Sequence, residues 1–122
     1  MTRDEILKIP AGKKMDTLIA KHVFNHRVFM TFKDWESAGR PLYDQSGNNN
    51  VFVADVGGNL PKFSSYIESA WGVLEKFNWY HVTKPHARIM VELPDGISVL
   101  AETVPLAICR AALLAVMDNE NA

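Results

Sequence analysis

The sequence PLAICRAALLAVM, residues 105–117, decides how this chain folds. It predicts an α-helix with Thr103 as the capping residue and Pro105 in the first turn, where the missing N–H of proline has no helical partner. The run is apolar nearly all round, which is typical of a helix that is buried on more than one side. We therefore expect one side to pack on a β-sheet and a second copy of the chain to cover the rest, in a dimer or a larger assembly.

Arg110 carries the only charge in this apolar run. A guanidinium that is removed from water costs several kcal/mol unless it is paired. One interpretation is an internal salt bridge, or a head group that reaches solvent at the end of its apolar stem. The other is that its partner is a ligand, because the planar guanidinium suits both a phosphate and the face of a base.

Periodicity predicts further helices and strands on the N-terminal side of this run. Thr2 and Glu5 have the spacing of a capping box, and so do Ser65 and Glu68, which indicates that a helix follows each pair. These helices are expected at 3–8 and 66–77, with another at 14–24. Strands are expected at 26–33, 51–56, 79–84, 88–93 and 97–102.

The order of the main elements is helix, two strands, helix, three strands, helix. Short connections such as Pro94-Asp95-Gly96 imply antiparallel neighbours. We therefore expect a single α+β domain over residues 1–122, with a mainly antiparallel five-stranded sheet and helices packed on it. The polar stretch 34–50, which is rich in Gly and Asn, is expected to form a loop that could close over a ligand.

A second group of candidate binding residues lies around the strand expected at 79–84. Aromatic rings beside an amide and an arginine can sandwich a base, read its edge and hold a phosphate. The alternative is that one face of this strand is simply core, and that an arginine on a strand is a solvated charge. Besides Arg110, the candidates are Phe77, Asn78, Trp79, Tyr80, Arg88 and Arg27.

The composition argues against several classes of function. The formal net charge is -1, whereas proteins that bind duplex nucleic acid present a strongly basic face. Cys109 is the single cysteine, so neither an internal disulfide nor a cysteine-cluster zinc site is expected. His22 and His26 have ligand spacing without the accompanying carboxylate, and no spacing marks a general acid–base pair. We therefore expect no enzymatic activity, no metal and no cofactor.

Targeting signals are also not evident in the sequence. The N-terminus lacks an apolar stretch that would direct secretion, and no apolar run is long enough to span a bilayer. We therefore expect a cytoplasmic protein that does not bind membranes.

Several segments together resemble the phage ABA-sandwich domain family. The resemblance covers most of the chain apart from residues 34–60, and its most specific motif is the final one. The segments that carry it are Met1–Leu7, Pro10–Gly12, Met15–Ala20, Ala70–Lys76 and Glu102–Ala115.

This resemblance implies a phage or prophage protein. Layout and size are also similar to those of phage anti-defence proteins that act as sponges. Such proteins bind the cyclic ADP-ribose isomer made by bacterial TIR-domain enzymes, hold it without cleaving it, and assemble as dimers or larger oligomers. The resemblance thus implies that Arg110, in the final motif, meets the nucleotide. Two alternatives stay open at this point, namely a module that inhibits a host enzyme by binding it and a small nucleotide hydrolase.

Overall fold

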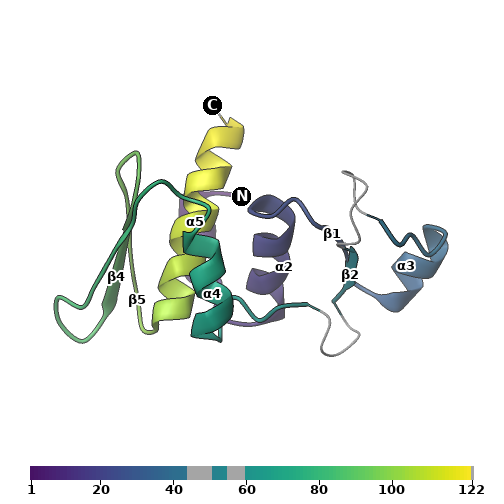
Figure 1. Cartoon of the computed structure of the whole chain (residues 1–122), viewed down its shortest axis with the longest axis horizontal. Helices are drawn as coiled ribbons and strands as arrows, with labels where there is room; N and C mark the ends of the chain where they lie inside the picture. The colour runs from purple at the N-terminus through teal and green to yellow at the C-terminus, as the bar shows by residue number, and fades with distance from the viewer. Residues whose placement is uncertain (44–50, 55–59, 122) are drawn as a thin grey trace.

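Helix α5 (Val104–Asn121) is the centre of a computed structural model, which describes residues 1–43, 51–54 and 60–121. Every residue from Leu106 to Leu114 is buried. Three other helices and a β-sheet pack on this helix (Figure 1). The three helices are α1 (Arg3–Lys8), α2 (Lys13–His22) and α4 (Ile67–Leu74).

The burial of α5 confirms the prediction that an all-round apolar helix is covered on more than one side. Its own chain supplies this cover, from Leu106 to Leu114, with helices on some sides and the sheet on another. Self-association therefore gains no support from this part of α5. It stays a prediction that a different surface would have to carry.

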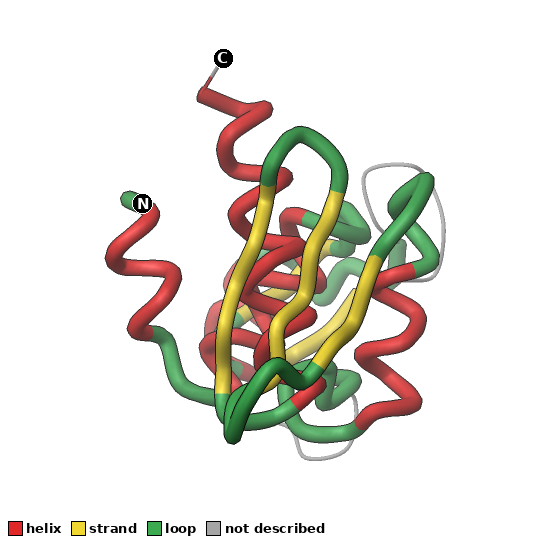
Figure 2. Tube along the Cα trace, turned by 90° about the vertical axis from the view of Figure 1, so that its left-hand side faces the viewer, coloured by secondary structure: helices red, strands yellow, loops and turns green. Residues whose placement is uncertain are grey.

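The sheet beside α5 has three antiparallel strands in the order β3 (His81–Thr83), β4 (Ile89–Leu93) and β5 (Ile97–Ala101). Buried and exposed residues alternate along β5, because successive side chains of a strand point to opposite faces. One face packs on α5, and Figure 2 shows that the other lies in front of the helices, with none of the described helices or strands over it. The predicted β4–β5 hairpin is confirmed, and its turn has φ angles of 66° at Asp95 and 78° at Gly96, which suit these residue types.

A second, smaller sheet contains β1 (Arg27–Phe29) and β2 (Val51–Val53), which run parallel to each other. Helix α3 (Phe32–Ser37) lies in the connection between them. In Figure 1 these three elements lie at one end of the molecule and β4 and β5 lie at the other, with the helices between them.

The expected five-stranded antiparallel sheet is therefore wrong, although the chain is α+β. The reason lies in the connection from β1 to β2. Thr31 accepts a hydrogen bond from the Asp34 N–H at 3.1 Å and so caps α3, which shortens the strand expected at 26–33 and makes part of the 34–50 loop helical. A connection of this length and content can return the chain to a parallel strand. Residues 44–50 and the end of the strand expected at 51–56 lie outside the described residues.

The predicted helix caps have different outcomes. The capping box of Thr2 and Glu5 is confirmed, with the Glu5 N–H 3.2 Å from the Thr2 hydroxyl. Thr103 also caps as predicted, since it accepts from the Leu106 N–H at 3.3 Å. The box predicted at Ser65 is wrong, because a turn on the carbonyl of Lys62 moves the start of α4 on by one residue. Tyr66 takes the capping position of α4 and makes no side-chain capping bond.

Candidate functional site

Arg110 is buried in α5, with 8% of its surface exposed. Its Nε and Nη2 atoms both donate to the backbone carbonyl of Ile9, at 3.2 Å and 3.0 Å. Within the described part of the chain no carboxylate forms an ion pair with it. The guanidinium thus joins α5 to the turn between α1 and α2, and a carbonyl dipole compensates its charge only in part.

A buried polar cluster holds the start of α2 against the segment that leads into α4. Asp16 accepts two hydrogen bonds from Ser64, one from its N–H at 2.8 Å and one from its hydroxyl at 2.6 Å. The Ser64 hydroxyl in turn accepts from the Gly12 N–H at 2.9 Å. Because Asp16 and Ser64 are both at least 96% buried, these bonds form away from water and fix the direction in which the chain enters α4.

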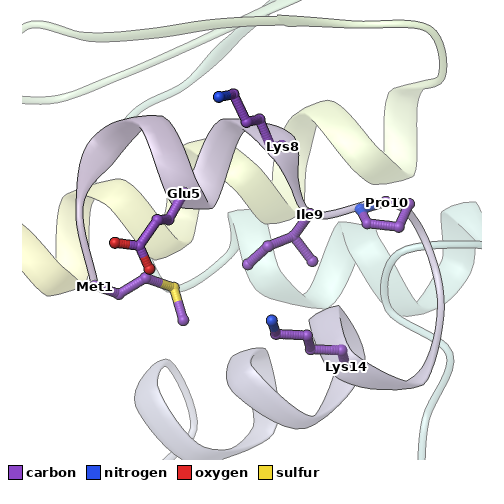
Figure 3. Close-up of a pocket in the computed structure, with 6 residues that line it drawn as sticks. All are labelled: Met1, Glu5, Lys8, Ile9, Pro10 and Lys14. Atoms are coloured by element: carbon purple, nitrogen blue, oxygen red, sulfur yellow. The ribbon is translucent and has the colours of Figure 1, made fainter.

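The first pocket, here called the α1–α2 pocket, has a volume of about 290 Å³. Ile9 and Lys14 point into the space between the two helices, with Met1 and Glu5 across from them, whereas Lys8 points away (Figure 3). The carbonyl of Ile9, one of the lining residues, accepts from Arg110. The pocket lining therefore combines two lysines and one carboxylate with apolar surface. The two donors of Arg110 that reach Ile9 are already bonded to its carbonyl. The remaining lining residue is Pro10.

The second pocket, here called the α4–α5 pocket, is larger, at about 480 Å³. It lies where the first turns of two helices meet, and its lining residues are Ser65, Tyr66, Ile67, Glu68, Ser69 and Pro105. In Figure 1, α4 and α5 run in the same direction, so their N-terminal ends lie together. The N-terminal end of a helix carries a partial positive charge and free N–H groups, and is suited to anions.

The free donors of this pocket belong to the backbone. In the described part of the chain, the N–H groups of Ile67, Glu68 and Ser69 have no hydrogen-bond acceptor. Tyr66 is 57% exposed, and the Lys62 ammonium lies 5.6 Å from the centre of its ring. A ring and three backbone donors therefore belong to the residues around one hollow, with the Glu68 carboxylate as an opposing charge. The Lys62 ammonium does not line the hollow and lies near its Tyr66 ring.

The structure does not bring the sequence-predicted binding residues together. Arg27 belongs to β1 and lies 5.1 Å from the centre of the Phe29 ring, whereas Arg88 precedes β4 at the other end of the molecule (Figure 1). Arg88 forms an exposed ion pair with Glu102 at 3.7 Å. Neither residue lines either pocket, and neither does Arg110.

The predicted aromatic group lies between α4 and β3 and divides between core and surface. Phe77 and Tyr80 are half-buried and pack against the core. Asn78 is exposed, and Trp79 is 48% exposed with its ring 5.4 Å from that of His81. A ligand role for this group stays a prediction.

The sequence analysis missed the residues of the α4–α5 pocket. Its only signal was the pair Ser65 and Glu68, interpreted as a capping box, which would have filled the helix end with a side chain. Backbone N–H groups have no sequence signature of their own. An uncapped helix start beside Tyr66 and Lys62 became visible only when the turn before α4 was known.

Two further observations bear on chemistry. Burial and, to a smaller extent, the Asp16 carboxylate raise the pKa of the Cys109 thiol far above its usual range, so its nucleophilic thiolate is suppressed. Among the described residues, no three His, Cys, Asp or Glu side chains gather where they could hold a metal ion. In the same part of the chain, no helix combines the length and apolar character needed to cross a bilayer.

The fold and its pockets define a small α+β domain built round one buried helix, with hollows at helix ends. The sequence profile of the Phage ABA sandwich domain matches residues 17–113, and the chain belongs to that family. The resemblance drawn from the sequence motifs is thus confirmed for the family. None of the curated proteins compared with the chain matches it.

A solved structure adds to this assignment. The crystal structure of a phage protein from Bacillus cereus ATCC 14579, at 2.0 Å, is similar over 87% of this chain and 86% of that chain. The two are 29% identical in sequence and superpose with a TM-score of 0.55. The chain is therefore similar to a phage protein in fold as well as in family.

Proposed function

We propose that this member of a phage protein family binds a cyclic nucleotide signal of the host's defence and sequesters it without cleaving it. The signal class is the cyclic ADP-ribose isomer made by TIR-domain enzymes, as for the Thoeris anti-defence proteins that the sequence resembles. The observation that carries the proposal is the α4–α5 pocket, which combines free backbone donors with an exposed ring and a nearby ammonium.

Each part of such a ligand has a partner of suitable chemistry in this pocket. Phosphate oxygens would accept from the N–H groups at the start of α4, where the helix dipole also favours negative charge. The adenine would stack on the free face of Tyr66, a contact worth roughly 1–3 kcal/mol for a base on an aromatic ring. The volume of about 480 Å³ lies within the usual range for small-molecule sites.

Retention without turnover needs only binding groups. The suppressed thiolate of Cys109 offers no nucleophile, and the pocket lining contains a single carboxylate, that of Glu68. One carboxylate beside hydroxyl groups lacks the second titrating partner that general acid–base hydrolysis of a phosphate or glycosidic bond normally uses.

The proposal is tested by capture and release. The purified chain is incubated with the cyclic ADP-ribose isomers made by a TIR-domain enzyme, freed of unbound ligand, heated to unfold it, and the supernatant is assayed for intact signal. We expect intact signal in stoichiometric amount. Loss of the signal on incubation would indicate a hydrolase, and absence of any captured signal would contradict the proposal.

The site is tested in the same assay with Tyr66→Ala. We expect at least about a tenfold loss of affinity, because the base loses its stacking surface. Tyr43→Ala is the matched control, since Tyr43 is 60% exposed and is not part of either pocket. Equal retention by both variants would mean that the ligand binds elsewhere.

A further inference from the structure

The solvent-facing side of the β3–β4–β5 sheet, here called the open sheet face, has an apolar centre between two polar rows. The strand register places Met90 beside both Thr83 and Leu100. Leu100, on the edge strand β5, is 43% exposed. In Figure 2 no helix or strand of the described residues lies in front of this face. Adjacent large apolar side chains on an uncovered sheet face are a feature of surfaces that bind another protein.

Opposite charges lie on either side of this centre, one on the central strand β4 and one directly before it. Two residues after Met90 stands Glu92, with His81 and Ser98 as its register partners. Two residues before Met90 stands Arg88, which reaches Glu102 at 3.7 Å. Met90 and Glu92 are two apart on β4 and point to the same side. Arg88 directly precedes β4, and its contact with Glu102, which directly follows β5, places its charge at the end of the open sheet face beyond Met90. The face therefore carries plus, apolar and minus in this order.

We propose that the open sheet face is a dimer interface that binds a second copy of this chain. A two-fold axis perpendicular to β4, passing beside Met90, inverts the order of the rows. It brings Glu92 of each copy opposite Arg88 of the other and stacks the two apolar centres, Met90 and Leu100, on each other. An isologous contact needs such self-complementarity, and a line of opposite charges about an apolar centre provides it.

The charges also select this arrangement over the other two-fold packing of the same face. An axis parallel to the strands would keep the rows in register and set Arg88 against Arg88 and Glu92 against Glu92. Like charges face to face in an interface are strongly unfavourable. The ion pair of Arg88 and Glu102 within one chain does not prevent Arg88 from pairing with Glu92 of the other copy. Both side chains of the ion pair are more than half exposed, and such pairs contribute little to stability.

The interface is small, which sets the expected strength. Three strands span about 10 Å between the outer two, so the contact lies at the lower end of specific interfaces. We expect a dimer that dissociates in the micromolar range and not a permanent one. The inference is independent of the proposed nucleotide binding, because the α4–α5 pocket shares no residue with this face.

The test reverses each of the two charges by substitution and measures dimerisation by sedimentation velocity over a range of concentrations. We expect the wild-type chain to shift from monomer to dimer, and Glu92→Arg and Arg88→Glu each to weaken the dimer by at least about tenfold, because each sets like charges opposite each other twice. The chain carrying both substitutions is expected to dimerise again. The two single variants mixed together are expected to form a heterodimer, since each then supplies the charge that the other lacks.

Controls separate this geometry from other causes. Glu36→Arg reverses an exposed charge on α3, at the other end of the molecule, and is expected to leave the dimer unchanged. Circular dichroism checks that each variant is folded. A wild-type chain that stays monomeric up to high concentration would overturn the proposal. So would a dimer that persists in both single variants, or a double variant that does not recover dimerisation.

Discussion

The α1–α2 pocket and the α4–α5 pocket differ in where their positive character resides. A full buried charge, the guanidinium of Arg110, contacts the lining residue Ile9 of the first, but its donors are bonded to the Ile9 carbonyl. The second has no buried charge, yet three backbone N–H groups at the start of α4 have no partner within the described residues. A conspicuous buried charge can therefore stabilise the fold, whereas unsatisfied hydrogen-bond donors provide the capacity to bind an anion.

The two pockets are also joined through the core. Gly12, close to the α1–α2 pocket, donates to the Ser64 hydroxyl, and Ser64 lies directly before the α4–α5 pocket. Asp16 holds Ser64 by two buried bonds. The buried polar groups of the molecule therefore position the pockets and do not line them.

The largest effect is expected from Arg110→Ala. It leaves the Ile9 carbonyl without its donors and opens a void beside α5, so we expect a loss of about 2–4 kcal/mol in the free energy of unfolding. Urea denaturation measures it. The matched control is Arg40→Ala, which removes an exposed ion pair with Glu36 and should change stability by less than about 1 kcal/mol.

Arg110→Ala also separates the two proposed roles of Arg110. The sequence interpretation has it hold a ligand phosphate, so that its loss would abolish retention in an intact fold. Under the structural role, Arg110→Met restores part of the stability, and the folded variant keeps normal ligand affinity. Alkylation of Cys109 reports unfolding in both variants, because the raised pKa of the buried thiol keeps it unreactive in the native state. A stable Arg110→Ala chain that fails to bind would support the ligand role.

A smaller loss of stability is expected from Asp16→Ala. The substitution leaves the Ser64 N–H buried without its acceptor and the Ser64 hydroxyl with only the Gly12 carbonyl, at 3.4 Å, which costs roughly 2–3 kcal/mol. Because Ser64 directs the chain into α4, we also expect weaker ligand binding at the α4–α5 pocket. Calorimetric unfolding and a ligand titration measure the two effects. Asp34→Ala, on exposed α3, is the control, and unchanged stability in Asp16→Ala would show that the cluster does not hold the α2–α4 contact.

The smallest effect is expected from Glu68→Gln. This side chain is the opposing charge in the α4–α5 pocket, and its neutralisation should tighten the binding of an anion by about threefold to fivefold. Glu5→Gln is the matched control in the α1–α2 pocket. Equal affinity in wild type and Glu68→Gln, or a gain only in Glu5→Gln, would move the site away from α4.

Some of the fold followed from local rules and some did not. The hairpin at Pro94–Gly96, the capping box of Thr2 and the burial of α5 each depend on neighbouring residues or on simple periodicity, so they could be predicted. The separate parallel sheet could not, because Thr31 can end a strand or cap a helix and only tertiary packing decides. The cover of α5 by its own helices was missed for a similar reason, since periodicity shows that a face is buried but not by what.

The candidate site was harder to predict than the fold. Arg110 was singled out correctly as buried and partnered, but its partner is a backbone carbonyl, which no sequence pattern marks. Arg27 and Arg88 share a residue type, and only the topology reveals that they lie at opposite ends of the molecule. Because of the turn at Lys62, α4 begins one residue later than the capping-box pattern predicts, and its N-terminal end is left open.

The most direct test of the account maps the ligand onto the two pockets by amide NMR. The isotope-labelled chain is titrated with the cyclic ADP-ribose isomer, and the backbone N–H shifts are followed. We expect the largest changes at residues 65–69, where the free donors of α4 would meet phosphate. Changes centred on residues 8–14, with unchanged N–H shifts at the start of α4, would contradict the account and assign the ligand to the α1–α2 pocket.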